Sequence, residues 1–366
     1  MSTTTTATTP AASTAAPGLI LALDLGKYKT VAFAYTGSPD TARFESLTTD
    51  RNRLGQLFAK YRPAVVVVEA CALSGWVADL CQELGLPCKV ANTASEAWKF
   101  KHTKRKTDKD DALRLAQLEA LGQLPTVTVP PTQTRQWRAL IACRQALVGR
   151  RCAAQNRIRA LLVGQGVTDP RGARAWTEAG LEGIGQHAKP LADCAADELW
   201  RGLLDLALAE YRHTLGLIDQ AEAKLDVLAQ ADAGVRLLQT IPGVGPRTAE
   251  TVVAYLGDAG RFTRGKQVSA YGGLVPRQYQ SGETDRRGRI TKRGPALLRK
   301  LLVECAWVML RYNPWARAVY ARLSRGKARK KQAIVALARK LLVRCWAMLR
   351  DGAPWRDDPQ PAAAPA

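Results

Sequence analysis

The sequence predicts an α/β N-terminal domain, a long helical arm and a mainly α-helical C-terminal domain. Up to about residue 121, short apolar segments alternate with segments of helical periodicity, as in layered α/β folds. Two long stretches of helical periodicity with few breakers follow, at 135–163 and 197–231. From Ile241 onward, Gly-rich turns precede basic segments with helical spacing, so this last part is expected to be mostly helical.

The strands expected in the N-terminal domain are short and apolar. The β-branched run at 64–68 indicates a central strand that is buried on both faces. Segments 19–23 and 30–35 flank a tight turn and are expected to pair as a hairpin. A further strand is expected at 87–91, helices are expected at 54–61, 76–84 and 108–121, and the prolines of 125–131 end the pattern.

Composition predicts where the domains begin and end. Residues 1–18 form an uncharged Thr/Ala/Ser/Pro tract that lacks the apolar surface needed for folding, so we expect a disordered tail. The arm is expected to be two antiparallel helices joined by the Gly/Pro-richer region 164–185. The predicted domains are the α/β domain at 19–130, the helical arm at 131–235, the C-terminal domain at 236–350 and a loose tail at 351–366.

The overall composition favours a basic cytoplasmic protein that does not act in a membrane. There are 54 Lys and Arg against 32 Asp and Glu, giving a formal net charge of +22, and 46% of residues are hydrophobic. No apolar run approaches the roughly 18–20 residues that cross a bilayer, and the N-terminus lacks a secretory signal. The eight cysteines form no C-x-x-C pair and there are only three histidines, so we expect reduced thiols rather than a zinc cluster.

Nearly all of the excess positive charge lies between residues 261 and 350. This segment has 23 Lys and Arg against three acids, Glu283, Asp285 and Glu304. Such a concentration is typical of a surface that binds a polyanion, with affinity that falls steeply with salt. A solvated basic surface without a partner is the alternative. An anionic membrane is less favoured, because the basic residues do not line one amphipathic helix.

Four carboxylates occupy positions where a phosphate-processing site would be expected. Asp24 and Glu69 each end a predicted strand, and ligands of α/β sheets gather at strand ends. Asp108 and Asp111 share one face near the start of a predicted helix, and Asp110 faces away. Clustered carboxylates repel unless a cation offsets them, and Mg²⁺ or Mn²⁺ prefers such oxygen ligands. Taken singly, each carboxylate is better explained as a turn or cap residue than as a catalytic one, and the combination of the four is what favours a metal site.

The C-terminal part carries two further motifs. Ile241-Pro-Gly-Val-Gly-Pro resembles a helix-hairpin-helix turn that would contact a phosphate, with a plain turn between helices as the alternative. Ser281 precedes a glycine in an expected loop. Its spacing alone favours an ordinary loop residue over a nucleophile. Four basic residues after it would hold phosphates: Arg287, Arg289, Lys292 and Arg293.

Taken together, these motifs resemble the DEDD transposases of the insertion sequence 110 family, which are RNA-guided serine recombinases. The matching segments run in the family's order over 19–350. They are Leu-Ala-Leu-Asp24-Leu-Gly-Lys, Val-Val-Glu69-Ala, Lys-Thr-Asp108-Lys-Asp-Asp111-Ala, Ile241-Pro-Gly-Val-Gly-Pro, Gly-Gly-Leu-Val-Pro-Arg-Gln-Tyr-Gln-Ser281-Gly and Gly-Arg-Ile-Thr-Lys-Arg-Gly.

The resemblance implies a RuvC-like domain of RNase H-like fold, in which Asp24, Glu69, Asp108 and Asp111 bind Mg²⁺, or Mn²⁺ in its place. It implies that Ser281 attacks DNA and becomes joined covalently to a strand end. It further implies donor and target DNA as partners, a structured bridge RNA as guide, homodimers that pair into a homotetramer with composite active sites, and a place in the bacterial cytoplasm at the nucleoid.

Several interpretations remain open at this level. A Holliday-junction resolvase would use the four carboxylates and water alone, and a decayed nuclease fold would only bind nucleic acid. Lys104, Arg105 and Lys106 are expected to contact nucleic acid, and His102 beside them is expected to be a phosphate contact or a bystander. Trp307, Trp315 and Trp346 recur at helical spacing, which favours core packing over base stacking.

Overall fold

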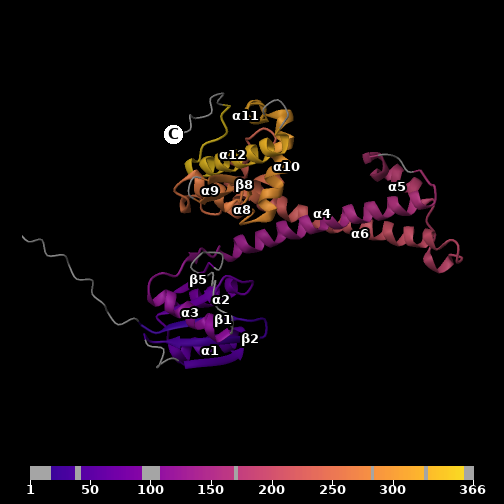
Figure 1. Cartoon of the computed structure of the whole chain (residues 1–366). Coiled ribbons are helices and arrows are strands. Elements are labelled where there is room, and N and C mark those ends of the chain that lie inside the picture. The colour runs from indigo at the N-terminus through magenta and orange to yellow at the C-terminus, as the bar shows by residue number, and fades with distance from the viewer. Residues whose placement is uncertain are drawn as a thin grey trace, which may run out of the picture. The chain divides into compact units, whose positions relative to one another are not determined.

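The computed structural model describes residues 18–37, 43–92, 108–168, 172–281, 284–324 and 329–357 (Figure 1). The chain divides into two compact units, Met1–Thr132 and Gln133–Ala366. Within the described ranges, every helix is too short or too polar to cross a bilayer.

The N-terminal unit is built on one six-stranded mixed sheet. Its strands lie in the order β3-β2-β1-β4-β5-β6. The central strands β1, β4 and β5 are parallel, whereas β2 and β3 continue the sheet antiparallel on one side and β6 on the other. The strands are β1 (Ile20–Leu25), β2 (Lys29–Tyr35), β3 (Arg43–Thr48), β4 (Val65–Glu69), β5 (Cys88–Ala91) and β6 (Thr126–Val127).

Helices cover both faces of this sheet. Alternate residues of a strand point to opposite faces. Leu23 and Val68 belong to the core that includes Phe58 of α1 (Arg51–Tyr61) and residues of α2 (Ser74–Glu83). Ala22 and Val67 belong to a second core, which includes Leu115 of α3 (Asp108–Ala120). The predicted α/β architecture of this domain is therefore confirmed.

Two strands of this sheet were not expected from the sequence. β3 lies at one edge of the sheet and alternates between exposed and half-buried residues, so it lacks the apolar run of a central strand. β6 has only two residues, both exposed, within the proline-containing segment that was expected to be irregular. Edge strands with one solvated face give weak sequence signals, because burial is what selects β-branched residues.

The second unit begins with two long antiparallel helices. α4 (Thr132–Gly164) and α6 (Leu199–Ala231) run side by side (Figure 1). Ile158 of α4 shares a core with Leu208 of α6, and towards the other end Leu147 shares one with Ile218. The order of these pairs reverses along the two helices, which confirms the predicted antiparallel pairing.

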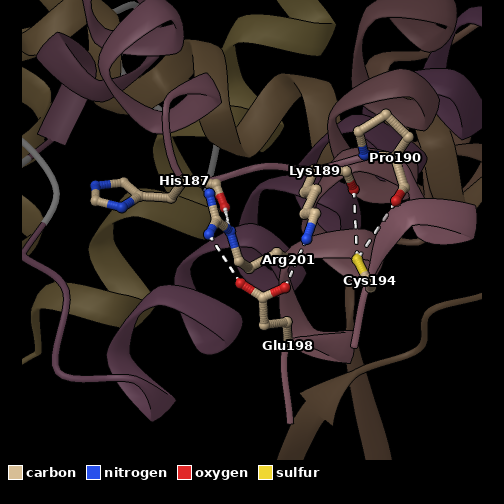
Figure 2. A network of polar contacts seen from close by, with 6 residues as sticks. All are labelled: His187, Lys189, Pro190, Cys194, Glu198 and Arg201. Atoms are coloured by element: carbon tan, nitrogen blue, oxygen red, sulfur yellow. Dashed lines mark hydrogen bonds and ion pairs between the residues drawn. The ribbon is translucent and has the colours of Figure 1, made fainter. Parts of the chain in front are cut away.

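The connection between the two long helices is more structured than expected. It contains the 3-10 helices η3 (Gly172–Trp176) and η4 (Leu191–Asp193) and the helix α5 (Glu178–Gly185). Figure 2 shows the polar network that holds it. Glu198 binds Lys189 at 2.6 Å and Arg201 at 3.2 Å, and Arg201 Nε donates to the His187 carbonyl at 3.0 Å. The same carboxylate thus ties the connection to the start of α6.

The rest of the unit is a helical domain with one large core, as predicted. The buried face of α12 supplies Leu337, Leu341 and Trp346 to that core. The elements of this domain are α7 (Ala233–Leu238), α8 (Pro246–Leu256), η5 (Ala259–Arg261), α9 (Gly265–Tyr271), the hairpin β7 (Pro276–Ser281) and β8 (Thr284–Ile290), α10 (Ala296–Tyr312), α11 (Pro314–Ser324) and α12 (Lys330–Asp351).

Polar contacts connect the long helices to α8. Arg138 of α4 donates to the carbonyls of Ala254 and Tyr255 at the end of α8, at 2.7 and 3.2 Å. Arg247 of α8 forms an ion pair with Asp226 of α6. Arg247 Nη1 also lies 3.4 Å from Oε1 of Glu250, whose side chain is only 1% exposed. A carboxyl group is therefore enclosed where α8 meets the arm.

Glu250 should make folding stability pH-dependent. Burial raises its pKa from 4.5 to about 7. The nearby positive charges of Arg247 and Arg144 lower this pKa, whereas the negative charges of Asp226 and Glu222 raise it further. Because the folded state holds this proton more tightly, the stabilisation is complete below pH 4.5 and is lost as the pH rises through 7. The size of this effect is roughly 3 kcal/mol.

Glu250→Gln should flatten the pH dependence of the unfolding free energy between about pH 5 and 8. Denaturant titrations across this range would measure it. Glu304→Gln is the matched control, because the side chain of Glu304 is 56% exposed and is not among the charges that act on Glu250, so this variant should keep the wild-type slope. An unchanged slope in Glu250→Gln would show that this carboxyl is not the source.

Candidate functional site

Strand pairing places two of the predicted carboxylates next to each other. Leu23 of β1 is paired with Val68 of β4 in parallel register. The next residue on each strand is Asp24 and Glu69, respectively, at the carboxyl ends of these central strands. Both are half-buried. They are two residues beyond Ala22 and Val67, so both lie on the face of the sheet that α3 covers.

The other two predicted carboxylates lie in the first turn of α3. Asp108 precedes Ala112 by four positions, and Asp111 precedes Leu115 by four, so both align with the helix face that packs on the sheet. α3 contacts β1, β2 and β4. Lys109 Nζ lies 5.4 Å from the centre of the Phe44 ring. The fold therefore brings all four carboxylates to the α3 side of one sheet.

The chemistry of this donor set fits a hard divalent cation. All four groups offer only carboxylate oxygens, as Mg²⁺ and Mn²⁺ prefer. Oε1 of Glu69 is buried, where a cation would offset the cost of a desolvated charge. Among the residues that the structure describes, no three His, Cys, Asp or Glu side chains are close enough together to hold a metal ion. The segment 93–107, which leads into α3, lies outside those residues.

The turn after Asp24 is held by hydrogen bonds that the sequence did not reveal. Gly26 N donates to the Lys29 carbonyl at 3.1 Å, and Thr49 N donates to the Tyr28 carbonyl at 3.0 Å. Thr49 Oγ1 donates to the Gly26 carbonyl at 2.8 Å and shares a 2.7 Å hydrogen bond with Thr30. A Cβ on Gly26 would lie 2.5 Å from the Lys29 oxygen, which explains glycine at this position.

Ser281 does not lie in a loop, contrary to the sequence interpretation. It is the last residue of β7 and pairs with Thr284, the first residue of β8. The two residues between them lie outside the described residues, as does the side chain of Ser281. The expectation failed because strand β7 is exposed and polar, so no apolar alternation marks it. Ser281 belongs to the second unit and the four carboxylates to the first.

Tight packing at the base of the β7–β8 hairpin explains the glycines of the motif around Ser281. Gly273 has a φ of +65°, and a Cβ there would lie 1.9 Å from the Arg293 carbonyl oxygen. Gly294 has a φ of +76°, and its Cβ would lie 2.0 Å from the Tyr271 oxygen. Arg299 Nη1 donates to the carbonyls of Arg293 and Gly294 at 2.9 and 3.0 Å. The motif thus anchors the hairpin that carries Ser281.

The predicted nucleic-acid contacts fall in two groups. Arg289, Lys292 and Arg293 are exposed on and after β8. Arg287 is part of β8, and its side chain lies outside the described residues. His102, Lys104, Arg105 and Lys106 all lie in the segment 93–107, outside them as well. The contacts of both groups with nucleic acid stay predictions.

The Pro-Gly-Val-Gly-Pro segment joins α7 to α8 and is tied to α10. Asn313 Nδ2 donates to the Pro242 carbonyl at 3.3 Å, and Cys305 Sγ donates to the Gly243 carbonyl at 3.4 Å. A Cβ on Gly243, where φ is +91°, would lie 3.0 Å from Met309 Cα. The absence of a side chain at Gly243 is therefore explained by packing, whereas Gly245 has open space around it. Phosphate binding by this turn stays a prediction.

Comparison with known proteins defines the class of this chain. Residues 21–165 match a transposase family of the DEDD type associated with IS110, and residues 235–321 match the Transposase IS116/IS110/IS902 family. These matches define an insertion-sequence transposase, an enzyme that acts on DNA. The DEDD transposases generally use divalent metal ions.

Individual relatives are similar to this chain, two of them over most of its length. The transposase for insertion sequence element IS1111A of Coxiella burnetii is 31% identical, covering 80% of this chain and 79% of the relative. A probable family 20 transposase of Pseudomonas aeruginosa is 30% identical, covering 82% and 88%. A pilin gene-inverting protein of Moraxella lacunata is 35% identical, covering 32% and 38%. The chain belongs to the IS110/IS116 family of transposases.

Gly273→Ala should loosen the hairpin that carries Ser281. The new Cβ would overlap the Arg293 carbonyl at a positive φ, so the backbone must shift, at a cost of about 2 kcal/mol or more. Hydrogen–deuterium exchange of peptides from 271–299 should accelerate. Gly216→Ala, in α6 with nothing within 4 Å of its Cβ, is the matched control and should leave exchange unchanged. Equal effects of the two substitutions would contradict this account of Gly273.

Proposed function

We propose that this transposase is a site-specific DNA recombinase with an RNase H-like, RuvC-like N-terminal domain. The observation that carries the proposal is the pairing of β1 with β4, which sets Asp24 beside Glu69 on the face that α3 covers. Asp108 and Asp111 open that helix. This arrangement supports a phosphodiester-processing site at the carboxyl edge of the sheet.

In this proposal, Asp24, Glu69, Asp108 and Asp111 hold Mg²⁺, or Mn²⁺ in its place. When bound, the ion supplies Lewis-acid stabilisation of the charge that develops on the scissile phosphate. The four carboxylates would hold this ion on the face of the sheet that α3 covers. The half-buried positions of Asp24 and Glu69 limit the access of water to this edge.

Ser281 is proposed as the nucleophile. Its oxygen forms a bond to phosphorus while the bond from phosphorus to a deoxyribose oxygen breaks. The serine hydroxyl loses its proton, and the departing deoxyribose oxygen gains a proton to become a free hydroxyl. Because one phosphodiester replaces another, the strand can be rejoined by the reverse reaction without ATP. The anchored hairpin base, with Gly273 and Arg299, supports this role by holding β7 in place.

The basic residues are proposed to bind the phosphates of nucleic acid. Arg289, Lys292 and Arg293 are exposed beyond Ser281 on the same hairpin and its base. Arginine forks bind phosphate oxygens in pairs, and the accompanying counterion release makes such binding sensitive to salt. Arg287 and the cluster Lys104, Arg105 and Lys106 complete the proposed set.

The partners proposed are donor and target DNA, a structured non-coding RNA guide, and further copies of this chain as a dimer that forms a tetramer. The carboxylates and Ser281 belong to different units of the chain, which is compatible with composite active sites. The Moraxella relative, whose name describes gene inversion, supports recombination rather than cleavage alone. The proposed setting is the bacterial cytoplasm, at the nucleoid.

A water-using nuclease that resolves Holliday junctions is the second candidate. It is favoured by the location of all four carboxylates in the N-terminal unit, apart from Ser281. The two candidates predict different products. A recombinase leaves DNA attached to Ser281, whereas a nuclease releases free cut ends that still depend on Asp24.

A denaturing gel separates these two functions. Labelled element-junction DNA is incubated with the protein, Mg²⁺ and RNA from the element's flanks. The recombinase predicts a slow band that protease treatment removes, and its loss in Ser281→Ala and in Asp24→Asn. Ser46→Ala is the control, because Ser46 is exposed on β3 at the sheet edge, and it should keep the band. Free cleaved DNA in Ser281→Ala would favour the nuclease.

A further inference from the structure

The tryptophans of the C-terminal domain have two different environments. Trp315 and Trp346 are 8% and 4% exposed, and they belong to the main core. Trp307 of α10 is 46% exposed, and the nearby Tyr312 is 61% exposed. Core packing therefore accounts for the first two and leaves Trp307 and Tyr312 without that explanation.

These exposed side chains occupy two neighbouring rows of α10, with Arg311 one turn from Trp307 and Tyr312 one turn from Val308. Trp307, Val308, Arg311 and Tyr312 follow the spacing i, i+1, i+4 and i+5 on α10, which places them on adjoining rows of the helix surface. Tyr320 of α11 adds a third ring, with its centre 6.1 Å from that of Trp307 and an angle of 56° between the planes. We call Trp307, Tyr312 and Tyr320 the α10 aromatic face.

Positive charge lies beside these rings. Arg317 Nη1 donates to the Arg311 carbonyl at 3.2 Å, so the two arginines lie next to each other at the junction of α10 and α11. Both are exposed, and within the described ranges neither forms an ion pair with an acidic side chain. The acid on this side of α10, Glu304, lies 3.9 Å from Lys300. The aromatic face is thus bordered by cations without neutralising partners.

We propose that the α10 aromatic face binds unpaired bases of single-stranded nucleic acid. The proposal rests on the proposed nucleic-acid function and names the part of the ligand that this surface takes. Exposed rings offer stacking surfaces to bases, and flanking arginines bind the backbone phosphates. Bases in a duplex have their faces covered by neighbours, so a single strand, a loop or a flipped base fits this surface.

Charge argues against a second copy of this chain as the occupant. Self-association through the same face would bring Arg311 and Arg317 close to their own counterparts, and the acid on this side of α10, Glu304, already lies 3.9 Å from Lys300. A polyanion with unpaired bases would stack on the exposed aromatic side chains and would also neutralise the arginines. The combination of large exposed rings and unneutralised arginines is what selects nucleic acid over an apolar protein surface.

The test compares two short oligonucleotides of equal length, one of thymidines and one with abasic sites throughout. Both have the same backbone charge, so their difference in affinity measures base contacts alone. Binding is measured by fluorescence anisotropy with a chelator present, which makes the result independent of catalysis and of the carboxylate site. The wild type should bind the thymidine strand on the order of 10-fold more tightly than the abasic strand.

The double substitution Trp307→Ala and Tyr312→Ala should remove most of that preference and leave affinity for the abasic strand unchanged. Trp307→Phe should retain part of it, because a ring remains. Val227→Ala is the matched control, since Val227 is 58% exposed on α6, outside this face. Circular dichroism melting would confirm that all variants are folded.

Two results would overturn the proposal. Equal affinity of the wild-type protein for the thymidine and abasic strands would show that only phosphates are bound. An unchanged base preference in the double variant, with a lowered sedimentation coefficient, would show that this face joins copies of the chain. Neither result would affect the proposed recombinase chemistry, which the covalent adduct tests separately.

Discussion

The parallel pairing of β1 with β4 is the constraint on which the candidate site depends. Because Leu23 is opposite Val68, the strands end together and present Asp24 and Glu69 at neighbouring positions of one edge. The alternation of side chains sends both carboxylates to the α3 face. A slip of one residue in either strand would move its carboxylate to the opposite face, among the buried residues that contact α1 and α2. Such a slip is costly because it would place the carboxylate among apolar side chains.

In the second unit, close backbone contacts determine where the hairpin with Ser281 lies, as strand register determines where Asp24 and Glu69 lie in the first unit. Gly273 and Gly294 allow the α9 end and the β8 end to approach until a Cβ would overlap a carbonyl oxygen. Arg299 then donates to the carbonyls of that same segment. The polar, exposed β7–β8 hairpin has little core of its own, so its position depends on this base. Residues that look like parts of a reactive motif are thus also structural.

The sequence predicted the central strands, the helices on both faces and the long antiparallel pair, because burial imposes clear patterns on such elements. It did not predict β3, β6 or the β7–β8 hairpin, whose described side chains are mostly exposed and follow no apolar period. For the site, Asp24 and Glu69 could be identified from strand ends. Thr30 and Thr49 could not, because their hydrogen bonds join residues far apart in sequence. Trp307 is exposed and Trp346 is buried, but both occur in segments with the same helical spacing, so the sequence could not tell them apart.

The central claim of the proposal is that three chain segments, those of Asp24, Glu69 and the start of α3, would supply the ligands of one divalent ion when it binds. Iron-directed cleavage tests it most directly. Fe²⁺ with ascorbate and peroxide generates hydroxyl radicals at the bound ion, and mass spectrometry locates the cuts in the chain. We expect cuts near residues 24, 69 and 108 that excess Mg²⁺ suppresses together and that Asp24→Asn abolishes. Glu83→Gln, at an exposed side chain of α2, should keep them. Cuts confined to one segment, or unaffected by Asp24→Asn, would contradict the claim.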